Sequence, residues 1–428
     1  MKPLSPEDLD RLQRDAFGYF ARHTHPQTGL VADCTRPGAP SSIAACGLGL
    51  SAYPIAVERG YVSRAVAAER AARMLAFFAN GKQGEGEEAI GNRGFFYHFL
   101  DMASGRRVWG CEVSTIDSSY VFAGALAAAR YFDGSGPVER SVRDGADAIY
   151  RRADWEWARN GGATVTHGWT PERGFIPYRW EGYSEALVLY ALALGSPTHP
   201  VPPESYEAWT KTYWWRNVYG IDYLHAGPLF IHQLSHVWVD FRGIQDAFMR
   251  EKECDYFENS RRATHVQQQY AIRNPLKFRE YGEHCWGVTA SEGPGPAVFE
   301  IDGVKRRFFS YLARGAPDGP DDGTIGPWGA VASLPFAPEI VLPTIRHLMK
   351  LGVGSTSPYG VEATFNPTFP DSGRRSGWLS PYNFGLNDGP IVLMIENYRT
   401  GLLWKLMREC EPIVRGLKAA GFRNGWLS

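Results

Sequence analysis

Hydrophobic residues recur at helical spacing in segment after segment of this sequence, whereas the alternating runs typical of strands are few and short. The pattern predicts a mainly α-helical protein with twelve helices, at residues 6–23, 43–59, 63–79, 114–132, 138–152, 184–194, 204–215, 243–270, 328–333, 338–351, 390–407 and 411–420. Six helix pairs closed into a ring, an (α/α)6 toroid, would use all twelve. The alternative is an open α-solenoid, but the chain lacks the fixed-period repeat of a solenoid. We expect one domain over residues 1–428.

Long stretches rich in glycine, proline and aromatic residues separate the predicted helices. They span residues 81–110, 160–183, 219–241, 274–326 and 352–389. Loops of this length are uncommon in compact domains unless they carry function, so we expect them to form a cleft over the helix ends. Some of them carry short strands. A hairpin signal lies at 298–301 and 306–309, around Asp302-Gly303.

The charge balance argues against nucleic acid or an anionic membrane surface as a partner. Forty-five Lys and Arg residues face 46 Asp and Glu residues, which leaves a net charge of −1. No apolar run reaches the roughly 18 residues of a membrane span. The first ten residues carry no export signal. We therefore expect a cytoplasmic enzyme, or a periplasmic one whose leader peptide has been removed.

The spacing of potential metal ligands predicts no metal site. The six cysteines form no CxxC pair, and we expect free, mostly buried thiols. His232 and His236 are four residues apart but lack the adjacent glutamate of a zinc-protease motif. The sequence also contains neither a phosphate-binding GxxxxGK[ST] loop nor a GxSxG nucleophile elbow.

The segment 179–185, Arg-Trp-Glu-Gly-Tyr-Ser-Glu, places two carboxylates and two aromatic rings directly before an apolar run. A sugar-cleaving site needs rings that hold a pyranose and an acid that protonates the departing oxygen. The structural alternative is a cap at Ser184, with Glu185 favouring the helix dipole from the first turn. Trp169 and Tyr178 in the preceding loop favour the catalytic role, because apolar rings raise the pKa of a carboxyl group.

A second group of carboxylates precedes the apolar run 120–132. Ser114-x-x-Asp117 is the pattern of a capping box, and Glu112 would then only favour the positive helix end. The same arrangement also aims carboxylates at a central cleft. Both interpretations remain open for these residues.

A third group surrounds Gly389-Pro390, a pair typical of a helix start. Asp388 just before it is either a cap or a site residue. Glu396 and Arg399 follow at a spacing of three, which also suits a simple ion pair on a helix surface.

Several segments together resemble the bacterial glucoamylase-like family, which includes the endo-β-1,2-glucanases of glycoside hydrolase family 144 and is related to the glucoamylase-like domain of cyclic β-1,2-glucan synthases. They are GFFYHFLD at 94–101, STID at 114–117, GYSEA at 182–186, ALALGSPTHP at 191–200, DYFENSRR at 255–262, WGVTAS at 286–291, SLPF at 333–336 and MIENYR at 394–399. They occur in order along nearly the whole chain, which makes the resemblance specific.

The resemblance implies an (α/α)6 toroid that hydrolyses β-1,2-linked glucose without a metal or organic cofactor. It also implies inversion, in which an acid protonates the leaving oxygen and a carboxylate activates water. Glu185 matches the acid candidate, and Asp117, Glu112 or Asp388 would act as base or hold the water. The chain reads Asn387-Asp388 where the family usually has Asp-Gln.

We expect the remaining site residues to bind sugar, although most of the 14 tryptophans should belong to the core. The predicted sugar-binding residues are Arg93, Tyr97, His98, Trp169, Trp180, Tyr183, His236, Trp286, Trp328, Asn387, Glu396 and Arg399. The partner is then β-1,2-glucan or its oligosaccharides, cleaved in endo fashion. The alternatives are an exo-acting enzyme that releases sophorose or glucose, a transglycosylase, and an inactive glucan-binding module.

Overall fold

The computed structural model describes residues 4–370 and 373–428 of the protein. It is 44% helix and 13% short strands, which confirms the predicted mainly helical fold. The α-helices are α1 (Pro6–Arg22), α2 (Ile43–Glu58), α3 (Arg64–Asn80), α4 (Thr115–Tyr131), α5 (Pro137–Arg152), α6 (Trp155–Arg159), α7 (Leu187–Leu194), α8 (Pro203–Thr210), α9 (Ala247–Glu251), α10 (Tyr256–Arg273), α11 (Pro327–Ala332), α12 (Pro338–Lys350), α13 (Gly385–Arg399), α14 (Leu402–Arg408) and α15 (Glu411–Ala419). None of the described helices is long and apolar enough to cross a membrane.

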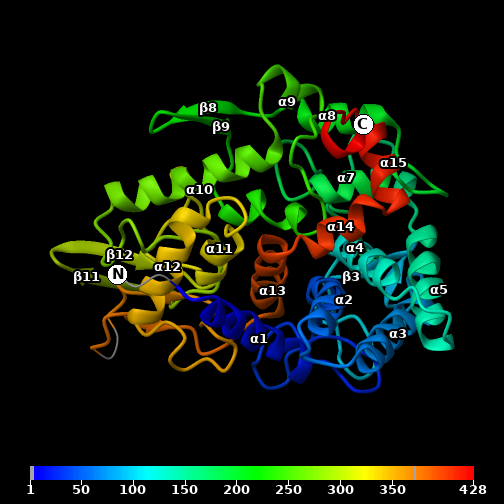
Figure 1. The fold of residues 1–428 in the computed structure, drawn as a ribbon, viewed down its shortest axis with the longest axis horizontal. Coiled ribbons are helices and arrows are strands. Elements are labelled where there is room, and N and C mark those ends of the chain that lie inside the picture. Colours follow the sequence, from blue (N-terminus) through cyan, green and yellow to red (C-terminus); the bar gives the residue numbers. More distant parts are fainter. Residues whose placement is uncertain (1–3, 371–372) are drawn as a thin grey trace.

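The buried helices form the centre of the molecule. Helices α2, α4, α7, α11 and α13 are buried along most of their length, whereas α1, α5, α12 and α15 bury only one face. A helix that is apolar all round is stable only inside a protein, and an amphipathic helix covers it. Helix α13 packs against α1, α2 and α11, and it lies near the middle of the view in Figure 1.

Helices α2 and α4 approach each other unusually closely through two glycines. A Cβ atom on Gly47 would lie 2.3 Å from the backbone of Tyr120, and one on Gly124 would lie 2.1 Å from the Gly47 carbonyl oxygen. Only glycine fits at such a crossing, because any side chain would collide with backbone. The crossing fixes the start of α4, where Asp117 lies.

Short strands cover the N-terminal ends of these helices. Strands β2 (Gly91–Asn92), β3 (Phe95–Tyr97), β5 (Val113–Ser114), β6 (Gly168–Thr170) and β7 (Gly174–Phe175) form an antiparallel sheet in that order. Strand β1 (Ser41–Ser42), paired with β4 (Phe99–Leu100), leads into α2, and β5 leads into α4. The remaining strands are β8 (Trp215–Val218), β9 (Ile221–Leu224), β10 (Ala290–Ser291), β11 (Ala297–Ile301), β12 (Val304–Phe308), β13 (Leu312–Ala313), β14 (Phe365–Asn366) and β15 (Trp378–Leu379).

The predicted helix bounds hold to within a residue or two for most of the chain, and β11 and β12 confirm the predicted hairpin. Two predicted helices are each divided in the structure. The range 243–270 becomes α9 and α10 because Asp246 and Asp255 each cap a new helix. The range 390–407 becomes α13 and α14, since Gly401 takes a left-handed conformation between them.

Candidate active site

A histidine joined to two carboxylates lies where the sheet of short strands meets helix α4. His98 follows β3, Glu112 precedes the paired strand β5, and the His98 amide donates to the Glu112 carbonyl at 2.9 Å. Asp117 lies in the first turn of α4. His98 Nδ1 lies 2.9 Å from Glu112 Oε1, and His98 Nε2 lies 3.4 Å from Asp117 Oδ2. Strand pairing thus brings three predicted site residues together.

The contacts of His98 require a charged ring. Both ring nitrogens face carboxylate oxygens, so both must carry a proton to donate. Burial opposes that charge, but Asp117, Glu112 and Asp33 outweigh it and raise the pKa of His98 to about 9. The hydrogen bond from His98 in turn lowers the pKa of Glu112. His98 therefore holds two carboxylates as an imidazolium, and its predicted contact with sugar hydroxyls stays a prediction.

Ser114 caps helix α4 without help from the Asp117 carboxylate. Its hydroxyl accepts a hydrogen bond from the Asp117 amide at 3.2 Å and donates one to Asp117 Oδ2 at 2.6 Å. The predicted capping box is therefore only half formed, because the carboxylate bonds to the hydroxyl of Ser114. The hydrogen bond from the Asp117 backbone amide to the Ser114 hydroxyl is enough to cap the helix.

Glu185 lies directly before helix α7, which begins at Leu187. Its carbonyl accepts a hydrogen bond from the Ser235 hydroxyl at 2.7 Å, and the same hydroxyl accepts one from the Val188 amide at 3.0 Å. Ser235 of the short 3-10 helix η2 (Leu234–Val237) therefore provides the cap. The predicted cap at Ser184 is wrong, and Glu185 lies outside the helix that it was expected to stabilise.

The environment of Glu185 favours its protonated form. The side chain is half-buried, and its burial together with the negative charge of Asp117 raises the pKa to about 7. A carboxyl group in this state can donate a proton near neutral pH. One site thus contains two carboxyl groups with different surroundings, those of Glu185 and Asp117.

Asp33 belongs to the same cluster, although the sequence analysis missed it. It lies between α1 and β1, and its carbonyl accepts a hydrogen bond from the Gly385 amide at the start of α13 at 3.0 Å. Burial and the charge of Asp117, opposed by His98, raise its pKa to about 6. The position of Asp33 depends on this contact between segments that are far apart in the sequence, and no local sequence pattern predicts such a contact.

Asp388 lies close to the start of helix α13. It is buried in the first turns of α13, and its burial raises the pKa well above the usual value. Within the described residues, its Oδ2 atom has no hydrogen-bond partner. A buried neutral carboxyl is unsuited to act as a base, which corrects the prediction for Asp388. Asn387 beside it is half-buried at the start of the same helix.

The four tryptophans predicted as sugar platforms belong to the core. Their exposed fractions are 8% for Trp169, 7% for Trp180, 0% for Trp286 and 3% for Trp328. Trp180 stacks on His167, with ring centroids 3.9 Å apart, and its indole nitrogen donates to Thr115 at 3.0 Å. These rings hold loops and helices together, so the prediction of exposed platforms is wrong for all four.

The two predicted tyrosines also have structural contacts. Tyr97 is buried, and the guanidinium of Arg107 lies 4.9 Å from its ring centroid. Tyr183 packs against Tyr256, with ring centroids 6.0 Å apart. The prediction of sugar contacts is therefore wrong for buried Tyr97, while half-buried Tyr183 stays a prediction.

Arg93 and His236 lie away from the cluster. Arg93 is exposed, and its guanidinium is 4.0 Å from Asp154, the cap of the outer helix α6. His236 is buried, with Nε2 at 3.0 Å from the Ser260 hydroxyl, and its burial lowers the pKa to about 3. Burial corrects the prediction for His236, whereas the sugar contact of exposed Arg93 stays a prediction.

Glu396 and Arg399 bind the far end of α13 to its neighbours. Glu396 accepts two hydrogen bonds from Arg59, at 2.7 and 2.8 Å, and Arg399 donates to Asp10 at 3.0 Å. A helix rises about 1.5 Å per residue, so Glu396 lies roughly 12 Å along the axis from Asp388. Both are structural residues, and the predicted pair between them is also absent from the described contacts.

We expect Glu396→Gln to destabilise the protein without changing turnover per folded molecule. Glu396 is 1% exposed, and its loss leaves Arg59 without its counter-ion, which should cost about 3 kcal/mol in the free energy of unfolding. Denaturant unfolding measures the change. Asp147→Asn, which breaks an exposed pair with Arg151, is the control and should cost less than about 1 kcal/mol. If Glu396→Gln instead abolished turnover and left the stability unchanged, Glu396 would be an active-site residue.

The most exposed aromatic residues are not the ones predicted as sugar platforms. Trp109, Tyr178, Trp214 and Tyr311 have exposed fractions of 71%, 68%, 56% and 63%. Trp109 has a positive φ of 56° and contacts Phe99, whose ring stacks on His98. Exposed rings are the feature that a sugar-binding surface requires.

Among the described residues, no group of three or more His, Cys, Asp or Glu side chains has an arrangement that could hold a metal ion. Asp33, Asp117 and Glu112 instead surround the His98 imidazolium, and Glu185 lies near Asp117. The chemistry of the site is that of carboxyl groups that donate and accept protons.

Comparison with known proteins places the chain in a family. Residues 177–411 match the Glycoamylase family model, described as "Putative glucoamylase". The crystal structure of a putative glucoamylase from Bacteroides uniformis is 30% identical, with a TM-score of 0.87 and 100% of both chains covered. The chain therefore belongs to the glycoamylase family.

Two relatives are named for activities on β-1,2-linked glucans. The endo-β-1,2-glucanase of Chitinophaga pinensis, solved with sophorotriose and glucose, is 26% identical, with a TM-score of 0.86 over 98% of this chain and 99% of that chain. An exo β-1,2-glucooligosaccharide sophorohydrolase of Parabacteroides distasonis is 28% identical over 97% of this chain. The chain spans 58% of the length of that second relative.

Proposed function

We propose that this chain is a glycoside hydrolase that cleaves β-1,2-glucan, with Glu185 as general acid. One observation carries the proposal. A half-buried carboxyl group with a pKa of about 7 lies near Asp117, a carboxylate paired with an imidazolium. An acid and a base of different protonation state are what glycoside hydrolysis requires.

In the proposed mechanism, Glu185 gives its proton to the glycosidic oxygen as the bond from that oxygen to the anomeric carbon breaks. Water attacks the anomeric carbon from the opposite face and gives its proton to the Asp117 carboxylate. The product is inverted at the anomeric carbon, and solvent later returns each group to its starting state.

Asp117 is our choice of base among the predicted carboxylates. Its Oδ2 atom receives the Ser114 hydroxyl and faces His98, and an imidazolium is the natural counter-ion of a carboxylate. Glu112 Oε1 is engaged by the other side of the His98 ring. We therefore assign to Glu112 the role of positioning His98.

The substrate and the mode of attack rest on similarity to characterised enzymes. The Chitinophaga pinensis relative is an endo-β-1,2-glucanase, which supports the proposed endo cleavage of β-1,2-glucan. Exo release of sophorose is the second candidate, favoured by the Parabacteroides distasonis relative. Product sizes over time test the proposal. Endo cleavage gives a ladder of oligosaccharides, exo cleavage gives sophorose alone, and no product contradicts both.

We further propose that the buried helices are the inner ring of an (α/α)6 toroid, in one catalytic domain. Contacts run from α11 through α13, α2 and α4 to α7. Between α7 and α10, the short helix η2 packs on α13 and caps α7 through Ser235, which suits the sixth inner position.

The raised pKa of Glu185 predicts a fall in activity at alkaline pH. Glu185 must be protonated to act, so kcat/KM should fall as the pH rises through about 7, where Glu185 loses its proton. Initial rates over a range of about pH 4 to 9 measure this limb. In the Glu185→Gln variant, the residual kcat/KM should not fall as the pH rises through about 7. An alkaline limb that survives this substitution would belong to another group.

A further inference from the structure

Trp109 presents an exposed ring next to the His98 cluster, which is formed by His98, Glu112 and Asp117. Its exposed fraction is 71%. The centroid of the Trp109 ring lies 5.0 Å from that of Phe99, and the Phe99 ring stacks on His98 with centroids 4.0 Å apart and an interplanar angle of 11°. The Trp109 ring is therefore no farther from the His98 ring than these two distances combined.

The chain also brings Trp109 to the cluster through the backbone. The His98 amide donates to the Glu112 carbonyl at 2.9 Å, and the Phe99 amide donates to Cys111 Sγ at 3.3 Å. The two segments thus lie side by side, with Trp109 three residues before Glu112. The side chains of His98 and Glu112 remain 32% and 29% exposed. An accessible ring beside accessible polar groups is the combination that a sugar-binding surface requires.

The backbone of Trp109 has a conformation that a bulky residue rarely adopts. The Cys111 amide donates to the Val108 carbonyl at 3.1 Å, which closes a four-residue turn. Its two central residues, Trp109 and Gly110, have φ values of 56° and 58°. Positive φ at both positions is the pattern of a type I′ turn, in which Gly, Asn and Asp are usual. The turn itself therefore disfavours tryptophan, and residues in such conformations are typical of functional sites.

Arg107 fixes the turn that carries Trp109. Its guanidinium donates to the Gly110 carbonyl at 2.6 Å and to the Cys111 carbonyl, and it binds Glu172 Oε1 at 2.6 Å. The Arg107 side chain is only 13% exposed. Because the backbone is held in this way, little conformational freedom is lost when the exposed ring contacts a ligand.

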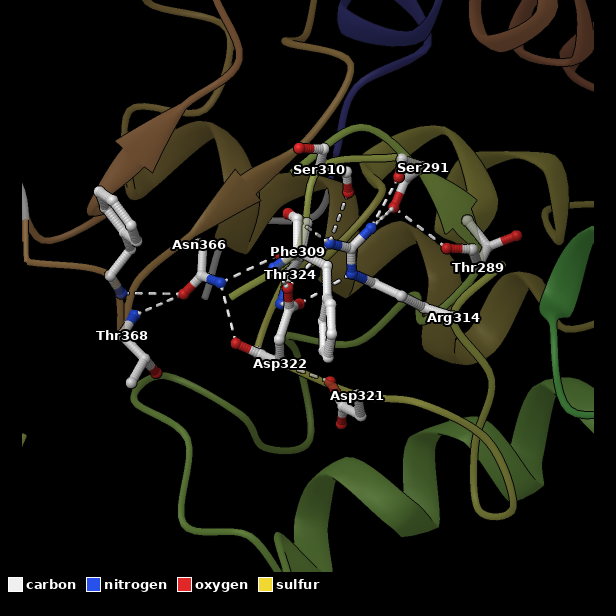
Figure 2. A network of polar contacts seen from close by, with 12 residues as sticks. Thr289, Ser291, Phe309, Ser310, Arg314, Asp321, Asp322, Thr324, Asn366 and Thr368 are labelled. Atoms are coloured by element: carbon white, nitrogen blue, oxygen red, sulfur yellow. Dashed lines mark hydrogen bonds and ion pairs between the residues drawn. The ribbon is translucent and has the colours of Figure 1, made fainter. Parts of the chain in front are cut away.

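The exposed rings of Trp214 and Tyr311 belong to other parts of the fold. Trp214 precedes β8 and packs on His225, with ring centroids 5.1 Å apart. Tyr311 directly follows Ser310, whose carbonyl accepts a hydrogen bond at 3.1 Å from Arg314 in the polar network of Figure 2. Among the ring contacts of the described residues, neither ring contacts the His98 cluster. Exposure alone therefore does not identify a ring of this site.

We propose that Trp109 is a substrate-binding residue, whose indole ring packs on the face of a glucosyl unit. The inference rests on the proposed function, because this unit belongs to the part of the glucan next to the bond that Glu185 and Asp117 cleave. The ring is not among the reacting groups, so it contributes equally to binding the substrate and the transition state. Such a contribution acts on KM and leaves kcat nearly unchanged.

Kinetics of Trp109→Gly and Trp109→Phe on β-1,2-glucan test the proposal. Loss of the ring should raise KM about tenfold or more, and the smaller ring of phenylalanine should raise it about threefold, with kcat changed less than about threefold. Tyr398→Ala removes a 40% exposed tyrosine from the far end of α13 and serves as the control, with wild-type KM expected.

Thermal unfolding of Trp109→Gly distinguishes a binding role from a structural one. Glycine adopts positive φ without strain, so the variant should melt at or above the wild-type temperature although its KM rises. A lower melting temperature with an unchanged KM would show that the ring only packs on Phe99, and it would overturn the inference.

The outcomes also separate the inference from the function on which it rests. A wild-type protein that leaves β-1,2-glucan intact overturns the proposed function and this inference with it. A wild-type protein that cleaves the glucan while Trp109→Gly keeps the wild-type KM overturns the inference alone. Oligosaccharide affinity in a Glu185→Gln background provides a second readout, and it should weaken by the same factor when Trp109 is also replaced by glycine.

Discussion

Replacing Glu185 by glutamine is expected to lower turnover on β-1,2-glucan by roughly 10²- to 10⁴-fold while the fold and the sugar affinity are retained. Glutamine has the shape of glutamate but no proton of suitable acidity. The backbone position of residue 185 is set by the Ser235 hydroxyl, which bonds to a carbonyl that the substitution keeps. Steady-state kinetics with a binding measurement therefore separates lost chemistry from lost structure.

Glu181→Gln is the matched control for this experiment. Glu181 is exposed four residues upstream in the same loop and accepts a hydrogen bond from Thr164 at 3.0 Å. It should keep nearly wild-type turnover. In the Glu185→Gln variant, turnover of an aryl glycoside with a good leaving group should fall less than turnover of glucan, because such a leaving group needs little protonation. More than about a tenth of wild-type turnover on glucan would place the acid elsewhere.

The second large effect is expected for Asp117→Asn. Turnover should fall by a factor similar to that for Glu185→Gln, because the amide cannot accept the proton of the attacking water. The melting temperature should change little, since the cap on α4 uses the backbone amide of residue 117 and the Ser114 hydroxyl. Kinetics and thermal unfolding of the same preparation measure both quantities.

Ser114→Ala offers the opposite pattern as a comparison. It removes the cap and should lower stability by about 0.5–2 kcal/mol while retaining more activity than Asp117→Asn. If Asp117→Asn instead lowered the melting temperature and left turnover per folded molecule unchanged, Asp117 would be a helix cap only. The base would then have to be sought at Asp33 or Glu112, whose side chains are also partly accessible.

The local patterns of the sequence predicted much of this fold. Helical spacing located α1 to α5 to within a residue or two, and Asp302-Gly303 predicted the β11–β12 hairpin. These features depend on neighbouring residues, which periodicity and turn preferences describe. The start of α7 was placed too early because its cap, Ser235, comes from a distant segment.

Sequence motifs located those residues of the candidate site that follow one another along the chain. Glu112, Asp117 and Glu185 lie in short motifs next to helix starts, and these motifs predicted them. Asp33 was missed because a contact with a segment distant in the sequence brings it to the cluster. Exposure is also a tertiary property, so composition could not distinguish the buried tryptophans from the exposed Trp109 and Tyr178.

The most direct test of the central claim measures new reducing ends when the wild-type protein and Glu185→Gln are incubated with β-1,2-, β-1,3-, β-1,4- and α-1,4-glucans. The account predicts that the wild-type protein releases reducing ends from the β-1,2-linked glucan, with little or none from the others. The Glu185→Gln variant should release almost none from any of them. Equal activity of the two proteins, or cleavage of another linkage with the β-1,2-glucan left intact, would contradict it.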